Sequence, residues 1–194
     1  MKINIENIDY NEALRYLGYK GKEISDALVR QIKSCGEKAL DVISPKGIYQ
    51  KHGRDVIMAV TLGSEMDRLI SKTQLTNMSD AVIIDAIAST LAEQTADELE
   101  KEIRADFEVD GKVLGGRFSP GYGDFPLTAQ KGIIELLEAD KRIGLTLNKN
   151  GMLSPVKSIT AIIKIYDEGE KIEKVRGCGS CNIKETCGFR KGSR

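Results

Sequence analysis

The spacing of apolar side chains predicts helices near the start of this 194-residue chain. From Ile24 to Ile43, apolar residues recur at steps of three and four, the period of an amphipathic helix, and Pro45 ends the pattern. A shorter helix is expected over 12–17, with Asp9 or Asn11 able to cap it. The isoleucines before this helix favour a strand or an extended arm.

The middle of the chain predicts a buried strand and the longest helix. Val56 to Leu62 is short, rich in β-forming residues and followed by a glycine, which indicates a strand. Ser64 can cap a helix, and Ser79 and Asp80 can cap a longer one that reaches about Phe107. Two faces of the longer helix differ in the size of their side chains. Bulky residues are Ile84, Ile87, Leu91 and Leu99, and a second strip holds Val82, Ala86, Ser89, Glu93 and Ala96.

The last third of the chain contains a glycine-rich stretch and predicts a helix and two strands. The glycine-rich stretch covers 111–123, the helix 127–139 and the strands 145–147 and 158–166. The connection between these strands is too short for a helical crossover, so they are expected to be antiparallel. The fold class predicted is α+β, a single domain with a twisted, mainly antiparallel sheet flanked by long helices. Residues 1–170 would form this domain, followed by a basic, cysteine-containing tail over 171–194.

Composition narrows the class of protein. Lys plus Arg and Asp plus Glu number 29 each, so the chain has no net basic field that would favour nucleic acid. With 41% hydrophobic residues and no Trp, it reads as a soluble domain with an aliphatic core. No apolar run predicts a signal peptide or a membrane span, and a cytoplasmic location is expected.

The ten residues Arg117 to Pro126, RFSPGYGDFP, have the composition of a binding loop. Two prolines restrict the backbone and two glycines permit a positive φ or a close approach. The guanidinium of Arg117 suits a bidentate contact with a carboxylate, and the ring of Tyr122 can stack on a base or lie against a cation. The alternative is a tight structural turn with a surface arginine.

The same region resembles the C-terminal activation domain of cobalamin-dependent methionine synthase. The resemblance rests on Arg-x-x-Pro-Gly-Tyr at 117–122, on Glu-Leu-Leu-Glu at 135–138 and on the order of the segments that follow, over about 91–165. It implies that Arg117 and Tyr122 contact S-adenosylmethionine, with Gly121 and the backbone of Ser119 beside them. Phe118, Ser119 and Gly123 replace the family's usual Pro, Ala and Pro, which implies a less rigid loop.

Two acidic residues join the implied site. The run Leu91-Ala92-Glu93 matches one in which the family has a ligand-contacting glutamate, and Ile8-Asp9-Tyr10 resembles another family contact. Together with Arg117 and Tyr122, these carboxylates would match the carboxylate, ammonium, sulfonium and ribose of the ligand. The alternatives are a helix cap for Asp9 and a solvated side chain for Glu93.

The last 17 residues contain Cys178, Cys181 and Cys187 in a C-x2-C-x5-C spacing. Such turns hold zinc or an iron–sulfur cluster, although a closed site normally needs a fourth ligand. His52, in a segment that reads as a loop, is the only histidine, and Cys35 belongs to the buried stripe of a helix. The alternative is a set of reduced, flexible thiols on a basic tail; the spacing also resembles that of free-standing relatives of the domain.

The resemblance implies a stand-alone reactivation subunit. It would present the methyl group of S-adenosylmethionine to cob(II)alamin on a partner methionine synthase or related corrinoid protein, with one electron from a flavodoxin-like or ferredoxin-like donor. No residue is assigned a catalytic role, because the chain shows no nucleophile–histidine pair and no cobalamin-binding Asp-x-His-x-x-Gly sequence. The alternative is a redox or metal-binding accessory protein of a corrinoid methyltransferase that acts through the C-terminal cysteines.

Overall fold

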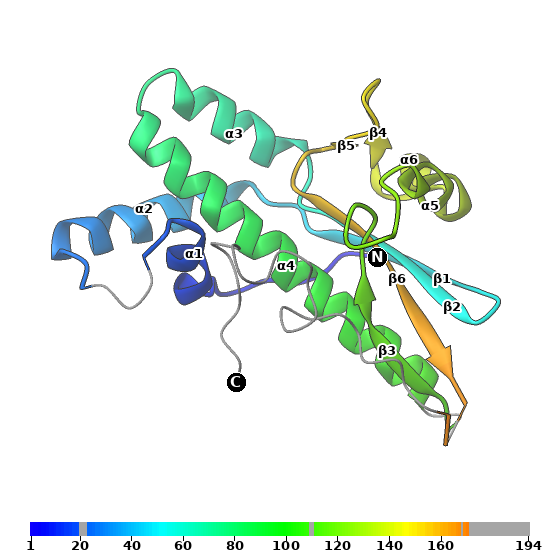
Figure 1. Cartoon of the computed structure of the whole chain (residues 1–194). Coiled ribbons are helices and arrows are strands. Elements are labelled where there is room, and N and C mark those ends of the chain that lie inside the picture. Colours follow the sequence, from blue (N-terminus) through cyan, green and yellow to red (C-terminus); the bar gives the residue numbers. More distant parts are fainter. Residues whose placement is uncertain (20–22, 109–110, 168, 171–194) are drawn as a thin grey trace.

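Four strands form one antiparallel sheet, and helices cover both of its faces (Figure 1). The computed structural model describes residues 1–19, 23–108, 111–167 and 169–170. The helices are α1 (Tyr10–Tyr16), α2 (Asp26–Val42), α3 (Ser64–Gln74), α4 (Met78–Glu108), α5 (Ala129–Leu137) and α6 (Ala139–Ile143). The strands are β1 (Lys46–His52), β2 (Asp55–Thr61), β3 (Val113–Phe118), β4 (Thr146–Leu147), β5 (Leu153–Ser154) and β6 (Ser158–Tyr166).

The main sheet has the strand order β1-β2-β6-β3, and each neighbouring pair is antiparallel. The short strands β4 and β5 form a separate antiparallel pair. The α+β class and the mainly antiparallel sheet predicted from the sequence are therefore confirmed.

The long helix α4 joins a helical region to the sheet. The side chains of Ile84, Ile87 and Leu91 pack in a core shared with α1, α2 and α3. Further along the helix, Leu99 and Ile103 pack in a second core against β2, β3 and β6. Figure 1 shows α4 passing from the three other helices to the sheet. Because both cores include α4, this helix fixes the position of one region against the other.

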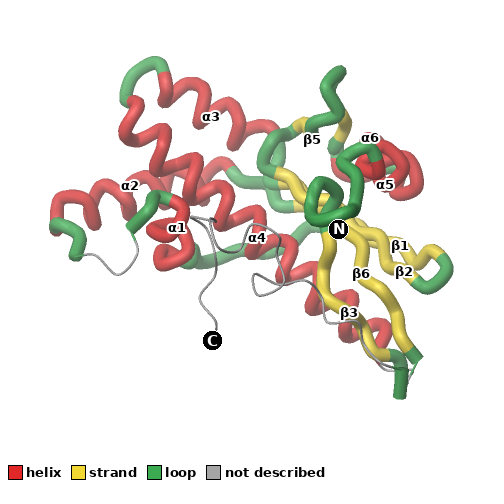
Figure 2. The backbone as a smooth tube through the Cα atoms, viewed as in Figure 1, coloured by secondary structure: helices red, strands yellow, loops and turns green. Residues whose placement is uncertain are grey.

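The two faces of the sheet follow from the alternation of side chains along β2. Val56, Met58 and Val60 pack in the core that contains α4, whereas Ile57 and Ala59 pack with α5 and α6. Successive side chains of a strand point to opposite faces, and here both faces are buried. The sheet is therefore a middle layer, with α4 on one side and the α5–α6 pair on the other (Figure 2).

Several boundaries differ from those expected. The sequence predicted a loop where β1 ends, but His52 is the last residue of that strand, which pairs along its length with β2 across a turn at Gly53. The start of the chain is an extended arm that forms one isolated bridge, between Lys2 and Lys46. The helix expected over 127–139 is divided at Glu138, whose φ of 48° separates α5 from α6.

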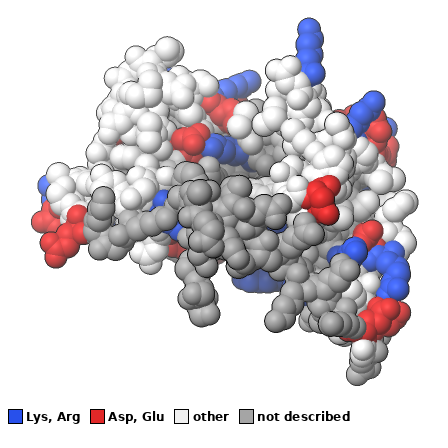
Figure 3. All heavy atoms as spheres, in the orientation of Figure 1, with Lys and Arg blue, Asp and Glu red and all other residues white. Residues whose placement is uncertain are grey.

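Where Figure 3 draws the described residues, basic and acidic side chains are interspersed. In the described part of the chain, none of the helices combines the length and apolar character needed to cross a bilayer.

We expect Leu99→Ala to lower the free energy of unfolding by about 2–5 kcal/mol, the usual cost of a cavity in a core. Leu99 is 0% exposed between α4 and the sheet, whereas Leu75, at the end of α3, is 87% exposed. The matched variant Leu75→Ala should therefore change stability by no more than about 0.5 kcal/mol. Urea unfolding followed by circular dichroism measures both; equal losses would contradict the described core.

Candidate functional site

A β-bulge in β3 determines which face of the sheet Arg117 occupies. Leu114 pairs with Ile165 of β6. Three residues further along β3, Arg117 pairs with Ile163, which is only two residues from Ile165, so β3 contains an extra residue at Gly115–Gly116. In a regular strand, Leu114 and Arg117 would point to opposite faces. The bulge places both on the face covered by α4.

The guanidinium of Arg117 lies among three carboxylates of α4. Its Nη2 donates to Oε2 of Glu93 at 2.8 Å. Its Nη1 lies 2.9 Å from Oδ1 of Asp97 and 3.3 Å from Oε2 of Glu100. The Arg117 side chain is 15% exposed, so these contacts are partly shielded from solvent and salt.

Arg104 connects these carboxylates to the bulge. Its Nε and Nη2 donate to Oε1 of Glu100 at 3.1 and 2.6 Å. The same guanidinium donates to the carbonyl oxygens of Leu114 at 3.3 Å and Gly115 at 2.8 Å. A bulge disrupts the regular ladder, and Arg104 supplies donors to the backbone there. We call Glu93, Asp97, Glu100, Arg104 and Arg117 the Arg117 ion network.

The segment after Arg117 is a compact turn held by its own contacts. Gly121, with a φ of 90°, donates its backbone N–H to the carbonyl of Phe125 at 2.8 Å. The N–H of Tyr122 donates to the carbonyl of Ser119 at 3.3 Å. The rings of Phe118 and Phe125 stack with centroids 5.6 Å apart. These contacts order the backbone of Ser119 and Gly121 a few residues from the guanidinium.

Tyr122 lies at the exposed end of this turn. Its side chain is among the exposed large hydrophobic groups, with 68% of the residue accessible. An aromatic ring in that position has a free face for a ligand or for a partner protein. The structure thus leaves the contact predicted for Tyr122 open to either.

Asp9 lies close to the site but is used locally. Its carboxylate accepts from the backbone N–H of Glu12 at 3.0 Å and caps α1, the alternative role considered for it. Its own N–H donates to Oε1 of Gln94 at 3.2 Å, and Gln94 also donates to the carbonyl of Asn7 at 3.0 Å. The N-terminal arm is therefore attached to α4 beside Glu93.

Tyr16 of α1 borders the same region. Burial raises the pKa of its phenol, and the negative charges of Glu93 and Glu12 raise this pKa further. The phenol therefore stays protonated at neutral pH.

The resemblance in sequence assigned Arg117 and Glu93 to one ligand site. Asp97, Glu100 and Arg104 were not predicted as members of the network. Asp97 and Glu100 follow Glu93 by four and seven residues, so all three lie on one helix face. That spacing was the signal available for them. Tyr16 carried no comparable signal, because its position depends on how α1 packs against α4.

The metal ligands proposed from the sequence, Cys178, Cys181 and Cys187, lie outside the described residues. Cys35 is buried in the helical core, as its periodicity predicts. Burial is the main cause that raises the pKa of its thiol to about 11, which makes it a poor nucleophile and metal ligand. Within the described ranges, no group of three or more His, Cys, Asp or Glu side chains could hold a metal ion.

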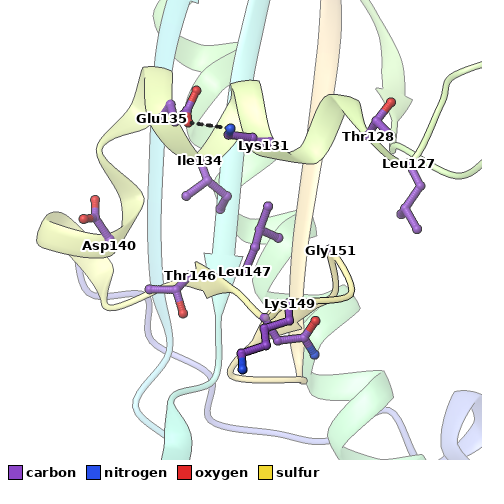
Figure 4. A pocket seen from close by; sticks show the side chains of 11 residues that line it. Leu127, Thr128, Lys131, Ile134, Glu135, Asp140, Thr146, Leu147, Lys149 and Gly151 are labelled. Carbon is purple, nitrogen blue, oxygen red and sulfur yellow. Dashed lines mark ion pairs between the residues drawn. The ribbon is translucent and has the colours of Figure 1, made fainter.

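A separate pocket of about 540 Å³ opens on the α5 side of the sheet (Figure 4). Ile134 and Leu147 point toward one another across it, and Lys131 forms an ion pair of 3.8 Å with Glu135 at its edge. Leu127, just beyond the loop, also lines it. None of the described site residues predicted from the sequence lines this pocket, and the Arg117 ion network lies on the opposite side of the sheet.

The arrangement suits recognition of a small ligand that carries charges of both signs. A guanidinium can bind a carboxylate through two hydrogen bonds, and neighbouring carboxylates can pair with an ammonium or another cation. The turn adds fixed backbone groups and an exposed aromatic ring. The fold and the site therefore define an α+β domain with a group of paired charges beside a compact turn.

A family model identifies the family, and a solved structure matches the fold. Residues 29–173 match the family model described as the vitamin B12 dependent methionine synthase activation domain. The fold matches the crystal structure of the MetH reactivation domain bound to AdoHcy, with a TM-score of 0.65 and 17% identity over 88% of this chain and 77% of that chain. No match is found among curated proteins. The chain belongs to the vitamin B12 dependent methionine synthase activation domain family.

We expect Gly121→Ala to destabilise the protein by about 1–2 kcal/mol, the cost of a left-handed conformation for a residue with a Cβ. The nearest atom to an added Cβ is Leu127 Cδ1 at 3.5 Å, so backbone strain and not a clash causes this loss. Gly132→Ala, in the helix α5 with no atom within 4 Å, should instead stabilise by about 0.5–1 kcal/mol. Thermal or urea unfolding of both variants tests the loop, and shifts in the same direction would contradict its geometry.

Proposed function

We propose that this protein binds S-adenosylmethionine at the loop 117–126 and presents its methyl group to a cobalamin held by another protein. The observation that carries this proposal is the contact between Arg117 and Glu93, two positions far apart in sequence that the resemblance assigned separately to one ligand. The related MetH domain was crystallised with AdoHcy, the demethylated form of that ligand, which further supports the proposal.

Within this site, each described group has a chemical role. Arg117 would bind the ligand carboxylate, and Glu93 would bind its ammonium once the guanidinium turns to the ligand. The backbone of Ser119 and Gly121 would contact the nucleoside, and the exposed ring of Tyr122 would lie against it. Asp9 would contribute from the arm that Gln94 attaches to α4. Binding in this manner fixes the methyl group for transfer without an acid or base from this chain.

The methyl acceptor would be cob(II)alamin on a methionine synthase or related corrinoid protein. One electron from a flavodoxin-like or ferredoxin-like donor would reduce the cobalt, and the methyl group would pass from the sulfonium to it, leaving S-adenosylhomocysteine. The only histidine, in Lys51-His52-Gly53, is not part of an Asp-x-His-x-x-Gly sequence, so this chain offers no such cobalamin ligand. We therefore propose a stand-alone reactivation subunit that acts with its partner in the cytoplasm.

A second candidate function rests on the spacing of Cys178, Cys181 and Cys187. We propose that residues 171–194 form a tail beyond the domain of residues 1–170 and that these thiolates hold zinc or an iron–sulfur cluster, a role typical of such spacing. In this case the protein would be a redox or metal-binding accessory of a corrinoid methyltransferase. The two functions are compatible if the tail supplies the electron.

The ligand is tested by calorimetry with S-adenosylmethionine. Arg117→Ala should weaken binding about ten- to a hundredfold, because hydrogen bonds to charged groups contribute about 1.5–3 kcal/mol. Arg117→Lys keeps the charge but not the paired donors, and should lose part of this affinity. Arg68→Ala removes an exposed arginine of α3 that pairs with Glu65, and should bind as the wild type does. No binding by the wild type, or equal binding by all variants, would exclude the proposed ligand site.

The two functions are separated by a methyl-transfer assay with a methionine synthase that lacks its own activation domain. With cob(II)alamin, a chemical one-electron reductant and labelled S-adenosylmethionine, the wild type should produce methylcobalamin, which is measured by its absorbance and by its label. At a concentration of S-adenosylmethionine below saturation, Arg117→Ala should strongly reduce this product, whereas replacing Cys178, Cys181 and Cys187 with Ser should not. The accessory function predicts that the cysteine variant loses bound zinc or iron. It also predicts that the cysteine variant, but not Arg117→Ala, loses activity when a physiological protein donates the electron.

A further inference from the structure

We propose that Asp97 pairs with the guanidinium of Arg117 when no ligand is bound and that the carboxylate of a ligand displaces it. The displaced Asp97 then favours a ligand that carries an additional positive charge. The proposal rests on the proposed S-adenosylmethionine site. It assigns Asp97 a specificity role that neither the loop sequence nor the family match includes. The ligand it favours is a sulfonium amino acid, and the one it disfavours is the uncharged thioether left after methyl transfer.

The geometry shows that Arg117 is already engaged. Nη2 is bound by Glu93 at 2.8 Å and Nη1 by Asp97 at 2.9 Å, with Glu100 at 3.3 Å. A ligand carboxylate that binds Nη1 and Nη2 of Arg117 together must take the positions that these internal carboxylate oxygens now hold. Ligand binding at Arg117 is therefore an exchange of one carboxylate for another, and at least one internal carboxylate must move.

Of the three carboxylates around Arg117, that of Asp97 is the most exposed to solvent. Glu100 is 18% exposed and also accepts two hydrogen bonds from Arg104, which is itself bound to the backbone of β3. Asp97 is 61% exposed, against 39% for Glu93. An exposed side chain regains solvation when its ion pair breaks, so Asp97 moves at the lowest cost.

The net charge of the Arg117 ion network determines which ligand can best replace Asp97 at the guanidinium. Its three carboxylates and two guanidiniums leave one negative charge in excess. A ligand carboxylate adds another, and the ligand ammonium offsets only that one. Only two methylene groups separate a sulfonium from the α-carbon of the ligand. If the ligand carboxylate binds Arg117, the sulfonium would therefore lie near the network, at a separation over which salt screens charges only partly, since the screening length is about 8 Å. The excess charge therefore favours the sulfonium form over the thioether.

The experiment compares two ligands on three proteins. Calorimetry gives the dissociation constants of S-adenosylmethionine and S-adenosylhomocysteine for the wild type, Asp97→Asn and Glu98→Gln. Glu98 is the matched control: it is the next residue of α4, it is partly exposed and it pairs with Lys101 instead of Arg117. Thermal unfolding checks that each variant is folded.

We expect Asp97→Asn to bind S-adenosylhomocysteine more tightly than the wild type, because the competing carboxylate is gone. We also expect its preference for the sulfonium ligand to fall about two- to fivefold, the size of one ion pair near the surface. Glu98→Gln should keep the wild-type preference, and added salt should reduce that preference in the wild type more than in Asp97→Asn.

The outcomes separate this inference from the function on which it rests. If the wild type binds neither ligand, the proposed function is wrong and the role of Asp97 is excluded with it. If the wild type binds both and Asp97→Asn keeps the same preference, the proposed function stands and the inference fails. A fall in preference that Glu98→Gln shows equally would assign the effect to the overall charge of α4 and would also overturn the inference.

Discussion

The contact between Arg117 and the carboxylates of α4 is the interaction on which the rest of the site depends. It joins the edge strand β3 to α4, the helix that contributes to two of the three hydrophobic cores among the described residues. The contact requires the bulge at Gly115–Gly116, because without the extra residue the arginine would point to the α5 side of the sheet. Arg104 then binds the backbone of the bulge and holds Glu100 in place. A local irregularity of one strand therefore determines the chemistry of the site.

The position of the network along α4 has a second consequence. Glu93 lies where the helix passes from the helical core to the sheet core, and Gln94 binds the N-terminal arm at the same level. The arm and β3 thus contact neighbouring positions of α4, Gln94 and Glu93, although these segments are distant in sequence. Rigid helices and strands position side chains better than loops do, so the flexible contributions are confined to the turn that contains Tyr122.

The sequence predicted those parts of the fold and site that depend on local periodicity or on the loop motif. The long helix and the buried β2 belong to this group. The resemblance assigned Arg117 and Glu93 to one ligand, whereas the ion pair between them was not predicted. β1 was missed because its second half is polar and exposed, and its strand conformation comes from pairing with β2. β3 was missed because Gly115 and Gly116 remove the alternation that identifies a strand. The bulge could not be foreseen, since register depends on β6, far along the chain.

If the proposed site is correct, an exchange of ion pairs would allow Arg117, already paired in the structure, to bind a charged ligand. Ion pairs that are partly open to solvent contribute only about 0–1 kcal/mol, so replacing Asp97 by a ligand carboxylate costs little. In the proposed site, the network would keep Arg117 oriented before the ligand arrives, so that less conformational entropy would be lost on binding. The aromatic and backbone contacts of the loop would add to the affinity that Arg117 provides, whereas the choice between ligands would depend on the excess negative charge. The stack of Phe118 on Phe125 helps to hold the loop without using any charged group, so the loop conformation does not depend on the pairing of Arg117.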